Sequence, residues 1–393
     1  MSWSEPTAMD QKLRLVTDYR QGLITITELA ERHGVSRKTV YKWIARYEAE
    51  GPPGLEERSR KPHSCPHATS LLVTTELLDL RHHHPRWGAK KLIPILAKKH
   101  PDWEWPARST CCDLLRRYDM VPRTRRRARP GHPGKPYVPM EAPNEVWAAD
   151  FKGQFRTRDG QYCYPLTVTD GYSRFLLGCQ GLRSTRHVDS KPVFQRLFQE
   201  YGLPRIILTD NGVPFATSTL GRLSSLSVWW IRLGIYPALI EPGHPQQNGR
   251  HERMHRTLKA ETTRPPGANL SSQQRRFNEF REEFNHDRPH EALDQETPAS
   301  HYQPSARELP KKIPPIEYPA HYEKRRVSRD GAARFLAVQF QVTHTLGGEY
   351  IGLEEVDNGF WDVYYGPICL GRLDERTFQI DGRMGRGQKP TNL

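Results

Sequence analysis

Three acidic residues stand where apolar runs end or a helix begins, and these positions restrict the folds that the chain can adopt. Asp150 follows the apolar run 146–149, and Asp210 follows the run 206–209. Glu252 lies at the start of a basic stretch with helical spacing. Carboxylates at the ends of neighbouring strands can meet at one edge of a sheet, where ligands bind in α/β domains. The chain is therefore predicted to contain such a domain.

Residues 144–300 carry the pattern of a mixed α/β domain. Apolar and β-branched runs predict five strands, at 145–151, 164–169, 175–179, 205–209 and 236–240. Helical periodicity predicts helices at 188–201, 219–233, 248–261 and 271–285. Three strands come first and the later strands alternate with helices. This order predicts a mixed five-stranded sheet rather than a fully doubly wound domain.

The same three carboxylates indicate metal chemistry on phosphate. Mg²⁺ prefers oxygen ligands, and two such ions can stabilise the attacking and leaving oxygens of a phosphodiester. Glu252, Arg256 and Lys259 fall on one face of a helix, at i, i+4 and i+7. Each carboxylate alone also fits an ordinary strand end or helix start. Together, Asp150, Asp210 and Glu252 predict a metal-dependent site, with Arg256 and Lys259 beside it for a phosphate.

Residues 1–55 have the pattern of a helix-turn-helix domain. Apolar residues recur at helical spacing, Gly34 can adopt the positive φ of a tight turn, and Ser36 can cap the helix that follows. In such a domain the second helix enters the major groove of DNA. The side chains expected to face DNA are Arg37, Lys38, Thr39, Lys42 and Arg46. The alternative is an ordinary helical hairpin with a solvated basic face.

Two further segments precede the α/β domain. Residues 65–122 predict a second helical unit, for which a second helix-turn-helix module and a structural spacer are both open. Residues 123–140 form a basic, proline-containing linker that cannot bury enough apolar surface to fold alone. The positive charge of this linker would bind along the phosphates of DNA. The alternative is that the linker is only a solvated tether. The arginines expected at DNA are Arg125, Arg126 and Arg127.

The C-terminal part is rich in strands. Hairpin dipeptides such as Asp330-Gly331 and Asn358-Gly359 separate alternating apolar runs, and residues 320–381 therefore predict a small β-barrel. Residues 382–393 predict a disordered tail. The chain is thus expected to be multidomain, with all-α modules, the α/β domain and a barrel in this order.

The net charge and the cysteine content indicate which class of partner the chain binds and in which cellular compartment it is expected. The net charge of +14 indicates a polyanionic partner, most commonly nucleic acid. The six cysteines form no C-x-x-C pair and suggest neither a disulfide framework nor a zinc site. We find no signal peptide and no apolar run long enough to span a bilayer, so no membrane partner and a reduced cytoplasmic compartment are expected.

Over residues 140–305 the chain resembles DDE-type transposases of bacterial insertion sequences, which have a retroviral-integrase-like catalytic core. The segments that carry the resemblance are 146–150, 169–174, 208–212, 242–253 and 285–293 with Thr297-Pro298. More residues separate Asp210 from Glu252 than is usual in the family. The additional residues are expected near 220–230. The N-terminal zinc domain of retroviral integrases has no counterpart in this sequence.

The resemblance implies an RNase H-like core at 141–305 in which Asp150, Asp210 and Glu252 bind two Mg²⁺ ions, for which Mn²⁺ can substitute. It implies that Lys259 contacts transposon-end DNA. The implied function is that of a DNA transposase, which binds the ends of its mobile element and catalyses strand cleavage and transfer into target DNA. Such enzymes act on double-stranded DNA as homo-oligomers, associated with the bacterial nucleoid.

Two other functions stay open. A DNA-binding regulator with an inactive core would need only the helix-turn-helix and the basic linker, and would have no use for the three carboxylates. An RNase H-like nuclease that cuts without joining would use the carboxylates but not a module that recognises particular ends.

Overall fold

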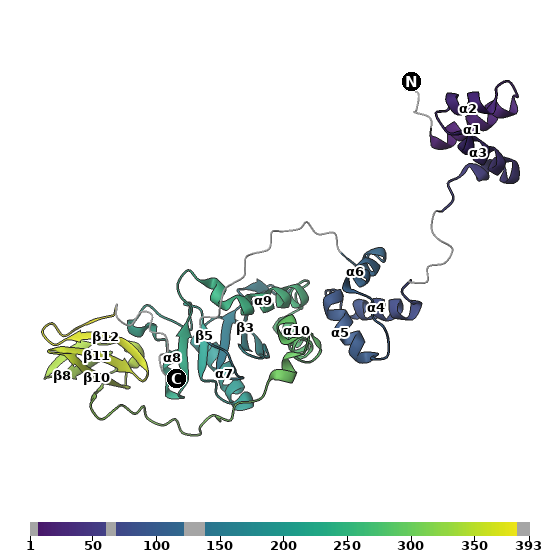
Figure 1. Cartoon of the computed structure of the whole chain (residues 1–393). Helices are drawn as coiled ribbons and strands as arrows, with labels where there is room; N and C mark the ends of the chain where they lie inside the picture. The colour runs from purple at the N-terminus through teal and green to yellow at the C-terminus, as the bar shows by residue number, and fades with distance from the viewer. Residues whose placement is uncertain (1–6, 60–67, 122–137, 383–393) are drawn as a thin grey trace. The chain divides into compact units, whose positions relative to one another are not determined.

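The computed structural model describes residues 7–59, 68–121 and 138–382, and divides into two compact units, Met1–Ser70 and Leu71–Leu393 (Figure 1). Within the described ranges, every helix is too short or too polar to cross a membrane. Most of the predicted linker at 123–140 and of the predicted tail at 382–393 lies outside the described residues, and so do Arg125, Arg126 and Arg127.

The first unit contains three helices, α1 (Ala8–Arg20), α2 (Ile26–Arg32) and α3 (Arg37–Glu50), and the 3-10 turn η1 (Pro52–Leu55). Thr7, Thr25 and Ser36 each cap a helix by accepting a backbone N–H with the side-chain oxygen. Gly34 makes the turn between α2 and α3 at a φ of 61°. The apolar side chains that the helices bury between them include Leu15, Leu29, Val40, Trp43 and Ile44. The predicted helix-turn-helix arrangement is confirmed.

The second unit begins with a helical part made of α4 (Leu71–His83), α5 (Ala89–Lys99) and α6 (Arg108–Arg117). These helices pack around the buried Trp87 and Leu92. The buried Arg81 guanidinium donates to the carbonyl of Trp87 and, at 2.6 Å, to that of Met120. This cation therefore supports the ends of two connecting loops by hydrogen bonds, which offset the cost of its burial.

A mixed sheet forms the centre of the second unit. Its strands are β1 (Val146–Phe151), β2 (Phe155–Arg156), β3 (Tyr162–Asp170), β4 (Leu176–Leu182), β5 (Ile206–Thr209) and β6 (Tyr236–Leu239). The order is β2-β3-β1-β5-β6, with β4 also paired to β3. The pairs β1–β3 and β3–β4 are antiparallel, whereas β1–β5 and β5–β6 are parallel. The sheet is mixed, as predicted, but it has six strands rather than five. The prediction missed β2 because a strand of two residues is too short to show a periodicity.

Helices cover both faces of this sheet (Figure 1). They are α7 (His187–Tyr201), α8 (Ser225–Arg232), α9 (Gly249–Thr262) and α10 (Leu270–Glu282). On one face, Phe194 of α7 and Trp230 of α8 pack against Trp147 of β1. On the other face, Leu258 of α9 and Phe277 of α10 pack against β3 and β4. The result is a three-layer α/β/α arrangement, in which β1 is a central strand.

One predicted helix is shorter than expected. The sequence predicted a helix over 219–233, but α8 begins only at Ser225. Ser224 caps this helix, and the residues before it form the 3-10 turn η2 (Leu220–Arg222). Leu223 also forms an isolated β-bridge with Ala216. The remaining 3-10 turns are η3 (Pro245–Asn248), η5 (Glu291–Leu293), η6 (Pro298–His301) and η7 (His344–Leu346). A π-helical segment, η4 (Glu283–Asp287), follows α10 directly.

The C-terminal part is an antiparallel sheet with a hairpin beside it. Its strands are β7 (Glu323–Arg326), β8 (Ala332–Phe335), β9 (Val338–Gln341), β10 (Tyr350–Asp357), β11 (Phe360–Tyr365), β12 (Ile368–Asp374) and β13 (Gln379–Asp381). The larger sheet has the order β13-β12-β11-β10-β7, and β8 pairs with β9 alone. Phe335 and Phe340 of the hairpin pack on Val363 of the sheet. Since the described strands do not close into one sheet, the predicted barrel is not confirmed.

Candidate active site

Asp150 and Asp210 lie at the same level on two neighbouring parallel strands. The register pairs Ala149 of β1 with Thr209 of β5, so the next residue along each chain is one of the two aspartates. His255 of α9 contacts the Asp150 carboxylate, which therefore points to the face of the sheet that α9 covers. Glu252 lies in the first turn of α9. All three carboxylates thus belong to elements that meet at one edge of the sheet.

The Asp150 carboxyl is partly buried, with 20% of its side chain exposed. This burial raises the pKa of Asp150 to about 7, and the Asp210 carboxylate adds to the rise. The Phe151 N–H and Lys152 oppose the rise, while Glu252 adds a smaller contribution to it. Asp150 is therefore within electrostatic reach of both other carboxylates, whose like charges oppose its ionisation.

The turn after β5 holds Asp210 in place. The Gly212 N–H donates to Asp210 Oδ1 at 3.1 Å, and a Cβ at Gly212 would lie 3.2 Å from Asp210 Oδ2. Glycine therefore lets the backbone fold closely around the carboxylate. The Asn211 amide nitrogen donates to the carbonyl of Ile240 at 2.9 Å. Its Oδ1 atom is buried and finds no hydrogen-bond partner among the described residues, which leaves a second oxygen available beside Asp210.

Two buried histidines of α9 connect the helix to the strand edge. His251 and His255 both place Nε2 at 2.6 Å from Thr167 Oγ1. His251 Nδ1 lies 3.0 Å from Thr169 Oγ1, and His255 Nδ1 lies 3.6 Å from Asp150 Oδ2. The contacts form a chain from β3 through α9 to the Asp150 carboxylate.

Both imidazoles are neutral near pH 7. Burial lowers the pKa of His251 to about 3, and burial together with His251 and Lys152 lowers the pKa of His255 further. The Thr167 hydroxyl has one hydrogen to donate, and two acceptors compete for it: His255 Nε2 and the Asp150 carbonyl oxygen, the latter at 3.1 Å. When Asp150 is ionised, an Nδ1–H of His255 faces its carboxylate and the Thr167 hydroxyl donates to His255 Nε2. His251 Nε2–H donates to Thr167, and the Thr169 hydroxyl donates to His251 Nδ1. These contacts orient His255 toward Asp150.

Sequence reasoning did not identify these two histidines. The available indication was their spacing: positions 251 and 255 are four apart and fall on the buried face of α9 with Leu258. Each alone is an ordinary buried histidine, and only the register of β1 and β3 brings Thr167 opposite Asp150.

The described residues contain no group of three or more His, Cys, Asp or Glu side chains close enough together to hold a metal ion. The three carboxylates thus share an edge and interact electrostatically, but they do not form a closed ligand shell. Asp210, Glu252 and Asn211 do offer oxygen atoms there, which is the donor type that hard divalent cations prefer.

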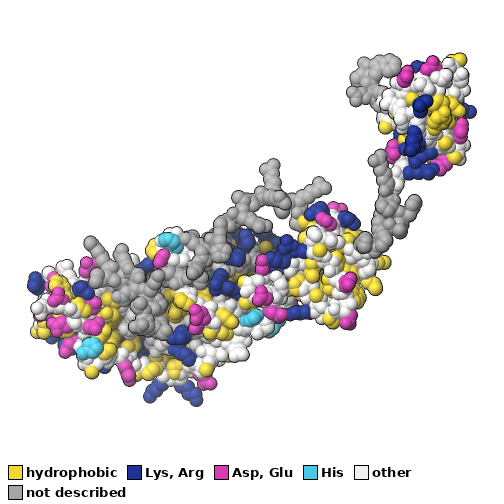
Figure 2. Space-filling view, in the orientation of Figure 1, with side chains coloured by type: hydrophobic (Ala, Val, Ile, Leu, Met, Phe, Trp, Pro, Cys, Tyr) yellow, Lys and Arg dark blue, Asp and Glu magenta, His cyan; other side chains and the backbone are white. Residues whose placement is uncertain are grey.

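The basic residues predicted beside the carboxylates are on the outer surface of α9. Arg256 and Lys259 are exposed, as is Glu252. Figure 2 shows Lys and Arg side chains gathered over the part of the core where Figure 1 shows α9. An exposed basic surface next to the carboxylates can attract a polyanion.

The predicted DNA-facing residues of the first unit divide into two groups. Arg37, Lys38 and Lys42 are exposed on α3. Thr39 is half-buried and its hydroxyl hydrogen-bonds the Ser36 hydroxyl at 2.9 Å. Arg46 is also half-buried, and its guanidinium lies 5.2 Å from the centre of the Trp43 ring. Lys42 also lies over this ring, with Nζ 4.3 Å from its centre. Thr39 and Arg46 are half-buried in these contacts, whereas Arg37, Lys38 and Lys42 are exposed enough to reach a partner.

Family models match both units. Two models described as an integrase core domain match residues 140–245 and 233–298. A model described as a helix-turn-helix domain matches residues 11–63, and one described as a homeodomain-like domain matches 39–115.

Similar proteins come from insertion elements and from a retrovirus. The chain is 22% identical over 312 residues to an uncharacterized 39.2 kDa protein of insertion element IS476 from Xanthomonas euvesicatoria, covering 77% of this chain and 81% of the relative. It is 24% identical over 238 residues to an uncharacterized 31.7 kDa protein of insertion element IS407 from Burkholderia multivorans, covering 58% and 79%. The solved HTLV-2 integrase catalytic core domain in complex with magnesium aligns at 15% identity and a TM-score of 0.34, covering 42% of this chain and 99% of that one.

Proposed function

We propose that this chain is a transposase that cleaves and joins DNA strands at the ends of an insertion element. Matches to an integrase core domain and, before it in the sequence, to helix-turn-helix domains support the proposal. The observation that carries the proposal is the parallel register of β1 and β5, after which Asp150 and Asp210 follow at equivalent positions. Burial and the Asp210 carboxylate raise the pKa of Asp150, so the two carboxylates are close enough to interact. This interaction supports a ligand that both carboxylates share. The two insertion-element relatives, matched over most of their length, support the biological setting.

The oxygen donors at this edge are of the type that divalent cations prefer. Asp150, Asp210 and Glu252 would hold two Mg²⁺ ions, and the buried Asn211 Oδ1 is a further oxygen without a partner among the described residues. The mutual repulsion of the carboxylates would be relieved by the cations. When bound, the two ions stabilise the attacking and leaving oxygens of a phosphodiester during in-line displacement.

The protein's own groups have separate tasks in this proposal. His255 orients the Asp150 carboxylate, and the turn at Gly212 orients that of Asp210. Arg256 and Lys259 bind phosphates of the DNA end along the outer face of α9. Lys259 lies seven residues beyond Glu252, about 10 Å along the helix, which is too far for a metal ligand but suits a phosphate of the same strand. In the first unit, Arg37, Lys38 and Lys42 read the terminal sequence of the element.

The test is a strand-cleavage and strand-joining assay with end-sequence duplexes and Mg²⁺. Asp150→Asn, Asp210→Asn and Glu252→Gln should each abolish both reactions while leaving DNA affinity nearly unchanged, because binding comes mainly from phosphate contacts elsewhere. Glu279→Gln, which changes an exposed carboxylate on α10, is the matched control and should keep full activity.

The outcomes separate the three candidate functions. Cleavage without joining would indicate a nuclease. Tight, sequence-specific binding with neither reaction, in the wild-type protein, would indicate a regulator. Appreciable joining by one of the three variants would remove that residue from the active site.

A further inference from the structure

A cavity lies on the other side of α9 from Glu252. It has a volume of about 420 Å³ and is lined on the helix by residues that include Arg250, Arg253 and Thr257. With about 100° between successive residues of a helix, Arg250 and Thr257 point away from Glu252, and Arg253 lies about 100° from it. The three carboxylates do not line this cavity. The cavity borders the candidate active site, because His251 and Thr169 of its lining belong to the contacts that lead to Asp150, but the carboxylates themselves lie outside it.

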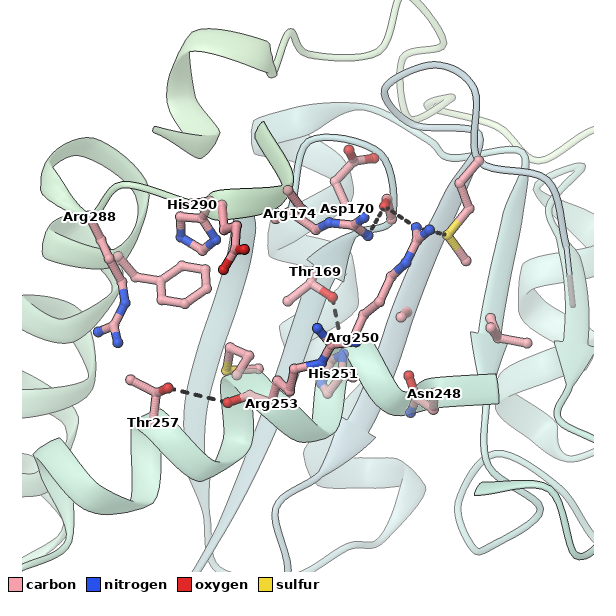
Figure 3. A pocket seen from close by; sticks show the side chains of 18 of the residues that line it. Thr169, Asp170, Arg174, Asn248, Arg250, His251, Arg253, Thr257, Arg288 and His290 are labelled. Carbon is pink, nitrogen blue, oxygen red and sulfur yellow. Dashed lines mark hydrogen bonds between the residues drawn. The ribbon is translucent and has the colours of Figure 1, made fainter. Parts of the chain in front are cut away.

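Four arginines line this cavity (Figure 3). Arg288 pairs with Glu261 at 3.0 Å, and the other three come from two segments. Arg174 follows the turn after β3, and its Nη1 donates to the Gly171 carbonyl at 2.7 Å. Arg250 donates to the same carbonyl at 3.0 Å. Arg253 donates to its own helix, to the Gly249 carbonyl, at 3.4 Å. We call the cavity bounded by Arg174, Arg250 and Arg253 the arginine pocket.

The acidic residues of the lining do not neutralise these arginines by ion pairs. Asp170 is fully buried and accepts from the backbone N–H of Asn144 and of Ser173, both at 2.8 Å. Glu291 pairs with Lys90. Among the described residues, no carboxylate lies within ion-pair distance of any of the three arginines.

The charges of the arginine pocket repel one another. Burial lowers the pKa of Arg174 to about 10, and Arg250 and Arg253 contribute to this decrease, against a smaller opposite effect of Asp170. Burial and Arg253 likewise lower the pKa of Arg250. A partly buried cluster of like charges is unfavourable unless an anion enters it, and an entering anion gains the interaction that the protein itself does not supply.

The remaining lining indicates what kind of anion fits. Gln247, Asn248 and Thr257 offer neutral polar groups, while Met254 and Phe284 offer an apolar surface. Guanidinium groups match the geometry of a phosphate, which they can bind in a bidentate manner. A nucleotide, with a phosphate on a sugar that carries a base, would use the cations, the polar groups and the apolar surface together.

We propose that the arginine pocket binds a phosphate group of a DNA strand, as a second contact on the core beside the carboxylates. This inference rests on the proposed function, because it takes the polyanion to be the DNA on which the core acts. It adds that α9 contacts DNA on two sides, near its first turn through the arginine pocket and along its outer face through Arg256 and Lys259.

The experiment measures the affinity of the full chain for an end-sequence duplex in EDTA, over a range of salt concentrations. The double variant Arg250→Gln/Arg253→Gln should lower the affinity at least tenfold and reduce the slope of log affinity against log salt by about 1 for each phosphate that the variant no longer binds. The control Arg275→Gln removes an exposed cation on α10 outside the pocket and should leave the slope unchanged. Both replaced arginines are exposed, so the double variant should fold, which circular dichroism would verify.

Ethylation of individual DNA phosphates then tests the contact directly. Wild-type protein should lose affinity when one or two particular phosphates are ethylated, and the double variant should be insensitive at those same phosphates. Inorganic phosphate and deoxyadenosine monophosphate serve as competitors that distinguish DNA from a free phosphate or nucleotide. Millimolar competition, far weaker than the duplex, supports the DNA assignment.

Several results would overturn the inference. Unchanged affinity and salt slope in the double variant would exclude the pocket as a DNA contact, while the proposed function would stand on the carboxylate variants. Competition by the mononucleotide as strong as that of the duplex would assign the pocket to a small phosphate ligand, and the same effect from an acidic peptide alone would assign it to a protein partner. Failure of the wild-type protein to bind any duplex would reject the proposed function itself.

Discussion

At the scale of single residues, Asp150 is a group whose environment departs far from that of a carboxyl in water. Burial and the Asp210 carboxylate together raise its pKa to about 7 from an ordinary value of 3.8. The pKa of Asp150 is higher in the folded state than in the unfolded chain. Protonation of Asp150 therefore contributes to the free energy of unfolding in full below pH 3.8, and this contribution is lost as the pH rises through 7. Metal-free protein at pH 8 therefore carries an unfavourable buried charge at this position.

We predict that Asp150→Asn stabilises the metal-free protein at pH 8, by about 2 to 4 kcal/mol, because the amide removes that charge. The gain should shrink as the pH falls toward 5. Calorimetric unfolding in EDTA at several pH values measures it, with Asp287→Asn as an exposed control. An equal dependence on pH in the wild type and in Asp150→Asn would contradict the assignment. Added Mg²⁺ should stabilise the wild type and not the variant.

His255 is a positioning residue whose effect should pass through the metal. The imidazole faces Asp150 from 3.6 Å and is itself oriented by Thr167. We predict that His255→Leu raises the Mg²⁺ concentration needed for half-maximal joining about 10–100-fold, because partners that orient metal ligands have effects of this size. DNA affinity in EDTA should not change.

The conservative variants of His255 separate positioning from packing. The amide nitrogen of Asn can occupy the place of Nδ1, which faces Asp150, whereas that of Gln is closer to the place of Nε2. His255→Asn should therefore recover more of the Mg²⁺ response than His255→Gln. Equal recovery by both, or equal loss of DNA binding and Mg²⁺ response in His255→Leu, would reduce the residue to a packing role.

At the scale of secondary-structure elements, α3 and α9 each present one apolar face and one basic face. On α3, Val40, Trp43 and Ile44 are buried, and this leaves Arg37, Lys38 and Lys42 exposed on the remaining surface. On α9, His251, His255 and Leu258 are buried beneath an exposed face that carries charge. In both helices, burial of one side determines which cations remain available.

For α3 we predict that Arg37→Ala or Lys42→Ala lowers the preference for end-sequence over random duplexes by about 1–3 kcal/mol where the side chain contacts a base. A phosphate contact would instead weaken binding to both duplexes and lower the salt slope by about 1. Fluorescence anisotropy with both duplexes distinguishes the two effects. The control Arg20→Ala changes an exposed cation on α1 and should have neither effect, so a similar loss in the control would argue against recognition by α3.

At the scale of the whole molecule, the chain combines two separately packed units with an overall charge of +14. The first unit has its own apolar core, and the integrase core domain has others of its own. In the function proposed above, the first unit and the core would act on the same DNA. The strong positive charge favours rapid association with a polyanion and makes it dependent on salt.

We predict that the active species is a multimer assembled on paired DNA ends, because one active site handles one end in the proposed reaction. Sedimentation of the protein with end-sequence duplexes should give a complex with at least two chains and two ends. The Glu252→Gln variant should assemble equally well, which keeps assembly apart from catalysis. A fully active complex with a single chain would contradict the prediction.

The sequence by itself was sufficient for the features encoded within a few residues. Ser36 and Gly34 marked the start and the turn of the helix-turn-helix, because a cap and a positive φ depend on local chemistry. The runs that end at Ala149 and at Thr209 predicted the strands of the mixed sheet, since a central strand reads as a continuous apolar run. The assignment of Asp150, Asp210 and Glu252 to metal binding stays a prediction.

Only the tertiary structure decided which distant residues meet. The chain of contacts from Thr167 through His255 to Asp150 depends on the register of β1 against β3 and on the rotation of α9, neither of which has a local sequence pattern. The arginine pocket likewise joins Arg174 to Arg250 at one carbonyl, although the two residues lie far apart in the sequence. Local periodicity fixes which face of an element is apolar, whereas the packing of several such faces at once selects the neighbours of each polar side chain.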